Sequence, residues 1–266
     1  MVLHLPQTLL SNARHYLIKK SDPAVGSVPE ELFETVLRQY SDVDTVFVHI
    51  GLSDVSSAFD GDPYDFIMDR LEAEFSSILA PGFTKSFRES HKFDVRESEP
   101  ELGAFSSLFF GRDMEYRTPD PLHSIMVKGD YRFEGCDFRD TFSEDGCYGR
   151  LENDDVLCLN VGTQWLVSTQ LHYLEQYFDV PYVDTVDIDG EIVLEDGTEK
   201  QITQTNYDKN NYIYFWNRRK ICEDMLEEGR LDHYELNGLS VTGFRLQNLA
   251  ELVGSKVQDD PYYLVR

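Results

Sequence analysis

One histidine stands among large apolar side chains in a stretch that reads as the first turns of a helix. The stretch VSTQLHYLEQYFDVPY, residues 167–182, contains His172 three residues before Glu175. An imidazole with a pKa near ~6.5 can accept a proton at neutral pH, which makes His172 a candidate general base. The simpler interpretation is a histidine packed at the surface of a helix, with Glu175 packed beside it or solvated.

Two further loops hold histidine and serine at the ends of expected strands. VHIGLSDV (48–55) contains His49, Gly51 and Ser53, and RTPDPLHSIMVKG (117–129) contains His123 and Ser124. Ligands of open α/β sheets usually bind at such loops. The sequence lacks the motifs GxGxxG, GxxxxGK[ST], GxSxG and HExxH, and no spacing among the three histidines supports a zinc site.

The elements that must position these residues alternate along the chain. Continuous apolar runs predict buried strands, and apolar residues at helical spacing predict helices. Strands are expected within 44–55, 76–84, 123–129, 154–162 and 236–246. Helices are expected within 27–40, 62–75, 103–112, 215–229 and 246–257, besides the one that carries His172.

Two elements have more specific signals. The first helix opens with Ser27 as N-cap and Glu30 three residues later, a capping box, and its buried stripe is expected to be Leu32, Val36 and Leu37. Residues 184–208 alternate in polarity around two Asp-Gly pairs, which predicts an antiparallel β-meander of hairpin type.

Interleaved strands and helices indicate an α/β fold: a single domain over 27–266, with a mixed β-sheet flanked by helices and the late antiparallel β-meander. Residues 1–26 are interpreted as an extension that starts with an amphipathic helix. This start lacks the features of a secretory signal, and the chain has no apolar run long enough for a membrane span.

Charge is the strongest global signal. Lysine and arginine number 24 against 49 acids, for a net charge of −25. Such a field repels nucleic acids and anionic membranes, so neither is an expected partner. The acidic residues are spread along the whole chain. This favours a protein from a cytosol of molar salt, where the Debye length is ~3 Å, over an ordinary acidic protein. The four cysteines have no metal spacing and read as reduced thiols, which predicts a cytoplasmic, halophilic protein.

Six segments taken in order carry a family resemblance. They are VHIGLS (48–53), LAPGFT (79–84), RTPDPLHS (117–124), CLNVGTQWLVSTQLHYLE (158–175), NYDKNN (206–211) and GLSVTGFRLQNLAELV (238–253). Over roughly residues 28–265 the chain resembles the aminoglycoside 3-N-acetyltransferase family, whose last long motif ends T-x-L-H-x-A-E. The resemblance implies an antibiotic-resistance type of enzyme that transfers an acetyl group from acetyl-CoA to an amine of an aminoglycoside or amino sugar.

The resemblance also implies roles for individual residues. His172 would be the base, and backbone N–H groups at a strand-end loop or helix start would hold an oxyanion. Acetyl-CoA would bind at His49, Gly51, Leu52, Ser53, Thr84, His123 and Ser124. Asp94, with its acidic neighbours, and Glu175 are candidates to bind the acceptor, although a solvated acidic face is the simpler interpretation of the acids around Asp94.

The sequence also departs from the family pattern. The family's carboxylate 34 residues after the base is replaced by Asn206, so Asp208 or Glu175 would have to supply the charge. Asp120 replaces the first histidine of the family's H-P-x-H-S. Two alternatives therefore stay open: a CoA-binding or interaction module of the same fold without catalysis, and nucleophilic chemistry through Cys158 or Ser168. Cationic candidates for the CoA phosphates are Lys85, Arg88, Arg96, Arg117 and Lys128.

Overall fold

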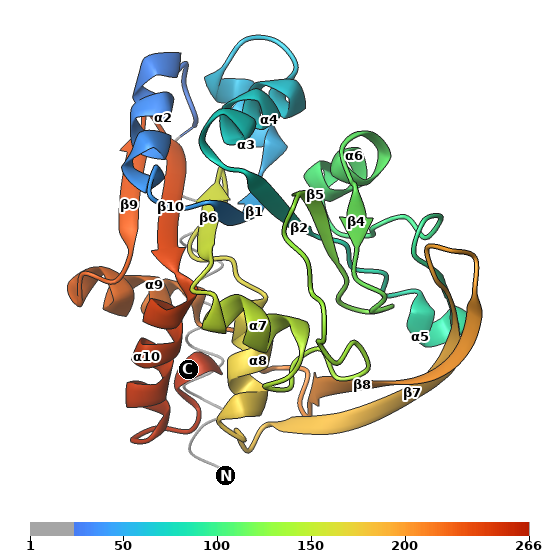
Figure 1. Ribbon diagram of the computed structural model, residues 1–266. Coiled ribbons are helices and arrows are strands. Elements are labelled where there is room, and N and C mark those ends of the chain that lie inside the picture. The colour runs from blue at the N-terminus through green and yellow to red at the C-terminus, as the bar shows by residue number, and fades with distance from the viewer. Residues whose placement is uncertain (1–23, 266) are drawn as a thin grey trace.

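A seven-stranded mixed sheet forms the centre of the protein. The computed structural model describes residues 24–265 (Figure 1). The strand order is β4-β5-β2-β1-β6-β10-β9. The strands are β1 (Thr45–Ile50), β2 (Ser77–Pro81), β4 (Tyr116–Arg117), β5 (Ile125–Gly129), β6 (Leu157–Val161), β9 (Asp232–Leu236) and β10 (Leu239–Arg245).

The three middle strands β2, β1 and β6 run parallel, and every further neighbour is antiparallel. Strands buried on both faces need apolar residues at successive positions, which explains runs such as the one from Val46 to Val48. The predicted mixed sheet flanked by helices is confirmed.

Helices cover both faces of the central sheet, in three layers. One apolar cluster packs Phe33, Val55, Ile67 and Phe109 against strand residues such as Val46. The helices of this layer are α2 (Glu30–Leu37), α3 (Leu52–Ala58), α4 (Pro63–Glu74) and α6 (Ala104–Arg112).

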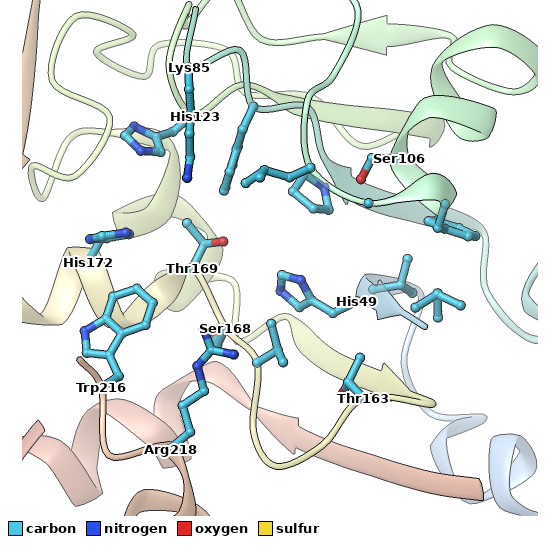
Figure 2. Close-up of a pocket in the computed structure, with 18 residues that line it drawn as sticks. His49, Lys85, Ser106, His123, Thr163, Ser168, Thr169, His172, Trp216 and Arg218 are labelled. Carbon is cyan, nitrogen blue, oxygen red and sulfur yellow. The ribbon is translucent and has the colours of Figure 1, made fainter. Parts of the chain in front are cut away.

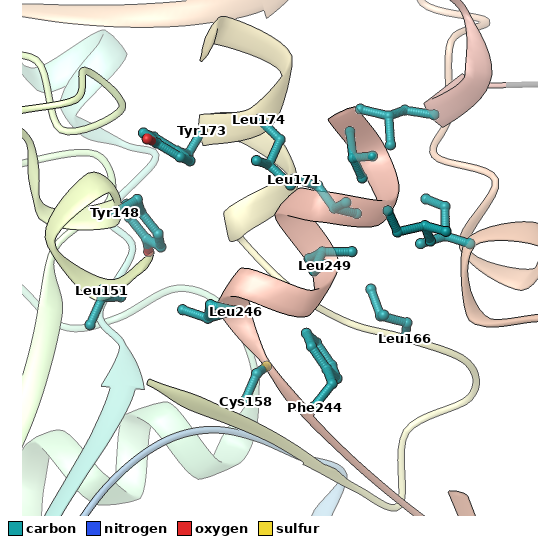
Figure 3. Packing of buried hydrophobic residues seen from close by; sticks show 14 of the residues in the cluster. Tyr148, Leu151, Cys158, Leu166, Leu171, Tyr173, Leu174, Phe244, Leu246 and Leu249 are labelled. Atoms are coloured by element: carbon teal, nitrogen blue, oxygen red, sulfur yellow. The ribbon is translucent and has the colours of Figure 1, made fainter. Parts of the chain in front are cut away.

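The opposite face is covered by a second apolar cluster. Leu171 and Leu174 of α8 (Gln170–Tyr177) pack with Leu246 and Leu249 of α10 (Leu246–Val257) over Cys158 of β6 (Figure 3). The other helices here are α7 (Cys147–Asn153) and α9 (Arg218–Glu227). This packing fixes α8, and therefore His172, relative to the ends of the central strands.

A second, three-stranded sheet is built around a long hairpin. Strands β7 (Val183–Val193) and β8 (Glu199–Lys209) are eleven residues each, and β3 (Lys92–Asp94) adds to β7 in parallel. The predicted late antiparallel segment is confirmed, but it is one hairpin with a single turn and not a meander with two turns. Gly197 lies in that turn, whereas Gly190 lies inside β7, where a Cβ would collide with the ring of Phe87.

The first helix differs from its prediction. Its N-cap is Pro29 with no side-chain cap, so the predicted capping box at Ser27 is wrong. The buried stripe consists of Phe33, Val36 and Leu37, while Leu32 is half exposed. A start at Glu30 places Leu32 on the outer face of the helix.

Several short elements were not expected from the sequence: α3, α5 (Phe87–Ser90), α7, β3, β4 and β9. The predicted N-terminal helix falls on residues 1–23, which lie outside the described residues. Among residues 24–265, no helix is long and apolar enough to cross a membrane.

Candidate active site

A cavity of about 360 Å³ lies at the carboxyl ends of β1 and β2 and beside the loop that follows β6. Its polar wall includes His49, His123, Thr169 and His172, and its apolar wall includes Val48, Ile50, Pro81 and Phe105. Figure 2 shows the labelled polar side chains arranged around one opening. The predicted ligand position at the strand ends thus coincides with a real cavity.

His172 lies in the first turn of α8 and reaches this cavity. Its side chain is 28% exposed, and its Nδ1 lies 3.5 Å from Oε2 of Glu175, one turn further along the helix. Residues three apart on a helix share a face, which explains the approach. The distance is long for a hydrogen bond.

Glu175 is almost completely buried, with 1% of its side chain exposed. The indole Nε1 of Trp216 donates to its Oε1 at 2.7 Å, and Nζ of Lys209 lies 3.4 Å from the same oxygen. Burial raises the pKa of Glu175, but the contacts from His172, Lys209 and Trp216 outweigh it, so the pKa is lowered overall. The residue is therefore a fixed anion behind the imidazole.

Trp216 contacts both this carboxylate and the ring of His172. Its ring is 4.5 Å from that of His172, edge to face, and the Lys209 ammonium lies 4.2 Å from the Trp216 centroid. Phe142 contacts His172 from another side, with ring centroids 5.3 Å apart. The imidazole is held between aromatic rings, which fixes its orientation.

Two more histidines line the cavity. His123 lies beside His172, with ring centroids 5.7 Å apart, and burial together with nearby positive groups lowers its pKa well below the ordinary value. Burial lowers the pKa of His49 to about 3. His49 Nε2, His123 Nδ1 and Thr163 Oγ1 are buried without a partner among the described residues. Neutral imidazoles with unsatisfied atoms are ready to bond a polar ligand.

Asp120 positions His123 instead of lining the cavity. Its Oδ1 accepts the backbone N–H groups of Leu122 and His123 at 2.7 and 2.8 Å, and burial raises its pKa to about 6. The aspartate that replaces a family histidine therefore closes the turn that carries His123.

Thr84 and Ser124 do not line the cavity. Both are buried and both bond the guanidinium of Arg117, at 2.9 Å each, while Ser124 Oγ also donates to Gly82 O at 2.6 Å. These contacts tie the loop after β2 to the start of β5. The predicted cofactor contacts at Thr84 and Ser124 are thus structural supports for the cavity wall.

Gly51, Leu52 and Ser53 are not among the residues that line the cavity. A Cβ on Gly51 would collide with the carbonyl oxygen of Gly162, so glycine here allows the ends of β1 and β6 to approach. Leu52 packs against the apolar cluster under α3, and Ser53 is exposed. Of the predicted cofactor residues, His49 and His123 line the cavity.

The predicted partners of the base are arranged differently from expectation. The Asn206 amide donates to Oδ1 of Asp208 at 2.7 Å, and Arg88 bonds both oxygens of Asp208, at 2.6 and 2.8 Å. The carboxylate that approaches His172 is Glu175. Glu175, predicted to bind the acceptor, is covered by protein and cannot contact it directly.

Asp94 also has a local role. Its Oδ1 accepts the backbone N–H groups of Arg96 and Glu97, at 2.8 and 3.1 Å, and so closes a turn at the end of β3. It is not among the residues that line the cavity.

Four of the five cationic candidates are engaged elsewhere. Arg88 binds Asp208, Arg96 binds Glu195, and Lys128 binds Glu72 and Asp113, while Arg117 is buried. Lys85 does line the cavity.

Sequence reasoning missed three residues at this end of the cavity: Trp216, Arg218 and Lys209. Lys209 ends β8, and Trp216 and Arg218 follow the hairpin; no motif marks any of them. The only available signal was a cluster of aromatic and cationic residues before a helix.

Neither proposed nucleophile has the environment of one. Cys158 is buried in β6 and burial raises the pKa of its thiol to about 12, which keeps it protonated. Ser168 lines the cavity, but its Oγ accepts the N–H of Gln170. Within residues 24–265, no cluster of histidine, cysteine or acidic side chains has the arrangement of a metal site.

This α/β fold has an imidazole in the wall of its strand-end cavity and a buried carboxylate behind that imidazole, which are groups that acid–base chemistry uses. The sequence model of the aminoglycoside 3-N-acetyltransferases matches residues 76–257, more than half of the chain. The chain belongs to this family, and the predicted resemblance is confirmed. Enzymes of the family use acetyl-CoA as the acetyl donor.

Solved structures share this fold. The YokD protein from Bacillus subtilis has a TM-score of 0.69 at 15% identity, over 88% of this chain and 94% of its own. AAC-IIIb in a binary complex with CoASH has a TM-score of 0.68 at 17% identity, over 85% of this chain and 96% of its own. Sisomicin-bound AAC-VIa has a TM-score of 0.67 at 17% identity, over 88% of this chain and 98% of its own. At these identities the likeness shows the fold alone. No curated protein sequence matches the chain significantly.

Proposed function

We propose that this protein is an acetyl-CoA-dependent N-acetyltransferase in which His172 is the general base. The observation that carries the proposal is the pair formed by His172, which reaches the cavity, and the buried anion Glu175 behind it. The acceptor is an amine of an amino sugar or aminoglycoside, as expected for this family.

His172 accepts the proton that the attacking amine loses. The neighbouring Glu175 carboxylate stabilises the imidazolium that results, and Trp216 and Lys209 hold that carboxylate in place. Thr169 lines the same cavity three residues before His172, and its hydroxyl is suited to donate to an oxygen on which negative charge develops.

The cavity suits the thiol end of acetyl-CoA, which would supply the activated acetyl group. The pantetheine arm of CoA combines apolar segments with amide groups. Val48, Ile50, Pro81 and Phe105 provide an apolar wall, and His49, His123 and Thr163 provide polar atoms without partners among the described residues. Amide groups of the arm would satisfy those buried atoms.

The alternative of a CoA-binding module without catalysis rested on Asn206 in place of a carboxylate. Because Glu175 supplies a carboxylate beside His172, that reason no longer favours the alternative.

A thermal-shift titration with acetyl-CoA tests the cofactor half of this proposal. Acetyl-CoA at 100 times its dissociation constant should stabilise the folded state by ~2.7 kcal/mol. The double variant His49→Phe/Thr163→Val, which removes two of the polar groups, should show a smaller shift. The matched control is His91→Asn, because His91 is exposed outside the cavity and its left-handed backbone (φ 55°) accepts asparagine. No shift for the wild type at saturating acetyl-CoA would contradict the proposal.

A further inference from the structure

The cavity has the opposite charge from the chain as a whole. The net charge is −25, yet the eighteen lining residues, all within the described part of the chain, include no aspartate or glutamate. Two of them, Lys85 and Arg218, are cationic (Figure 2). A protein with twice as many acids as bases has therefore excluded acids from this surface.

Arg218 is unusual among the arginines. Most described arginines form ion pairs with carboxylates. Arg218 is half-buried and forms no ion pair with any residue in 24–265; burial lowers its pKa. Its guanidinium lies 5.9 Å from the Trp216 ring. A partly desolvated guanidinium without a counter-ion is costly unless a ligand supplies the anion.

Three carboxylates are already bound by groups of the protein. Glu175 contacts Lys209 and Trp216, and Asp208 is bonded by both arms of Arg88. Glu101, beside the lining residue Leu102, accepts the backbone N–H of Ser86 with both oxygens. These three carboxylates are thus bound to groups of the protein itself.

A polycationic acceptor would find no counter-charge among the residues that line this cavity. Aminoglycosides carry several ammonium groups, and bringing them beside Lys85 and Arg218 without carboxylates is unfavourable. The CoA phosphates do not account for Arg218 either. Arg218 contacts Trp216, which contacts His172, so the charge lies at the end where the thioester must react. The length of the pantetheine arm keeps the phosphates away from that end.

We infer that the acceptor carries its amine beside an acidic group, such as a phosphate or carboxylate, which Arg218 and Lys85 bind while the amine faces His172. This inference rests on the proposed function and narrows it. An amino sugar that carries a phosphate fits this chemistry, and a polycationic aminoglycoside does not.

The test compares three amines as acceptors and as ligands: glucosamine 6-phosphate, glucosamine, which has no acidic group, and polycationic sisomicin. Turnover is followed by CoA-thiol release at fixed salt, and binding to the CoA-loaded protein by calorimetry. The phosphate-bearing amine should bind at least about tenfold more tightly than the other two. Arg218→Gln and Lys85→Gln should each raise its KM severalfold, while the KM for acetyl-CoA changes less than about twofold. Lys200→Gln, at the exposed end of the hairpin, is the matched control.

Tighter binding or faster turnover with sisomicin than with glucosamine 6-phosphate would overturn the inference. So would equal binding of all three amines, binding of none, or loss of acetyl-CoA affinity as the main effect of Arg218→Gln. Selective binding of the phosphate-bearing amine without turnover would support the inference and contradict the proposed function, so the two failures are distinguishable.

Discussion

Nδ1 of His172 lies 3.5 Å from Oε2 of Glu175, one helical turn further along α8. One member of the pair reaches the cavity and the other is buried, with Lys209 and Trp216 bound to its second oxygen. This arrangement supplies a carboxylate to the imidazole from within the same helix. It removes the need for a carboxylate at Asn206, which instead bonds Asp208.

Replacement of the buried anion tests that relationship. Glu175→Gln keeps the size of the side chain and an acceptor for Trp216 but removes the charge. We predict that kcat falls by about 10²- to 10⁴-fold while acetyl-CoA affinity is retained. Because Lys209 would be left unpaired, the double variant Glu175→Gln/Lys209→Gln separates loss of catalysis from loss of folding. Unchanged kcat in both variants would exclude Glu175 as the partner of the base.

The same residue predicts a difference in acid stability. Contacts with His172, Lys209 and Trp216 lower the pKa of Glu175 below its ordinary 4.5 in spite of burial. A lowered pKa in the folded state contributes stability above the unfolded pKa, and this contribution is lost as pH falls through the folded value. The free energy of unfolding should therefore decrease more steeply below pH ~4.5 in the wild type than in Glu175→Gln/Lys209→Gln. Parallel curves from chemical denaturation would contradict this.

Asn206 gives a prediction opposite to the one from sequence position alone. If it stood beside the base, Asn206→Asp would add a useful charge and raise the rate. In the structure its amide donates to Asp208, so the new carboxylate would face a like charge. We predict no gain in rate and a loss of unfolding free energy of ~1–3 kcal/mol, measured by denaturant titration. A variant that is as stable as the wild type and faster would restore Asn206 as partner.

The overall charge predicts a dependence on salt. The net charge is −25. Repulsion among the acids is screened at molar salt, where the Debye length is ~3 Å, but the Debye length grows to ~30 Å at 0.01 M salt and the repulsion is then largely unscreened. The Tm should therefore fall on dilution from molar to millimolar sodium chloride, with loss of far-UV circular dichroism at low salt. A spectrum and Tm that do not change would argue against adaptation to high salt.

The parts of the fold that were predictable are those that local sequence determines. Continuous apolar runs locate β1, β2 and β6, and their shared direction brings His49 and the loop before His172 to one edge of the sheet. The Asp-Gly pair at 189–190 wrongly predicted a turn. Gly190 instead allows close packing against Phe87, which belongs to a segment about a hundred residues earlier in the chain.

The site was only partly predictable because its support comes from distant segments. His172 and Glu175 are close in sequence, but the burial of Glu175 depends on Lys209 and Trp216 across the hairpin. The assignment of Asn206 relied on counting residues after the base, and a count does not show which group a strand side chain will meet. Arg218 carries no motif, and its significance comes from the carboxylates that are missing around it.

The most direct test of the central claim is acetyl transfer by the wild type and by His172→Ala. CoA-thiol release is followed with the amines named above, and the N-acetylated product is identified by mass spectrometry, with His91→Asn as control. The wild type and the control should form product, whereas His172→Ala should be slower by about 10²- to 10⁴-fold with acetyl-CoA binding intact. A His172→Ala variant as fast as the wild type, or a wild type that binds acetyl-CoA and acetylates none of the amines, would contradict the account.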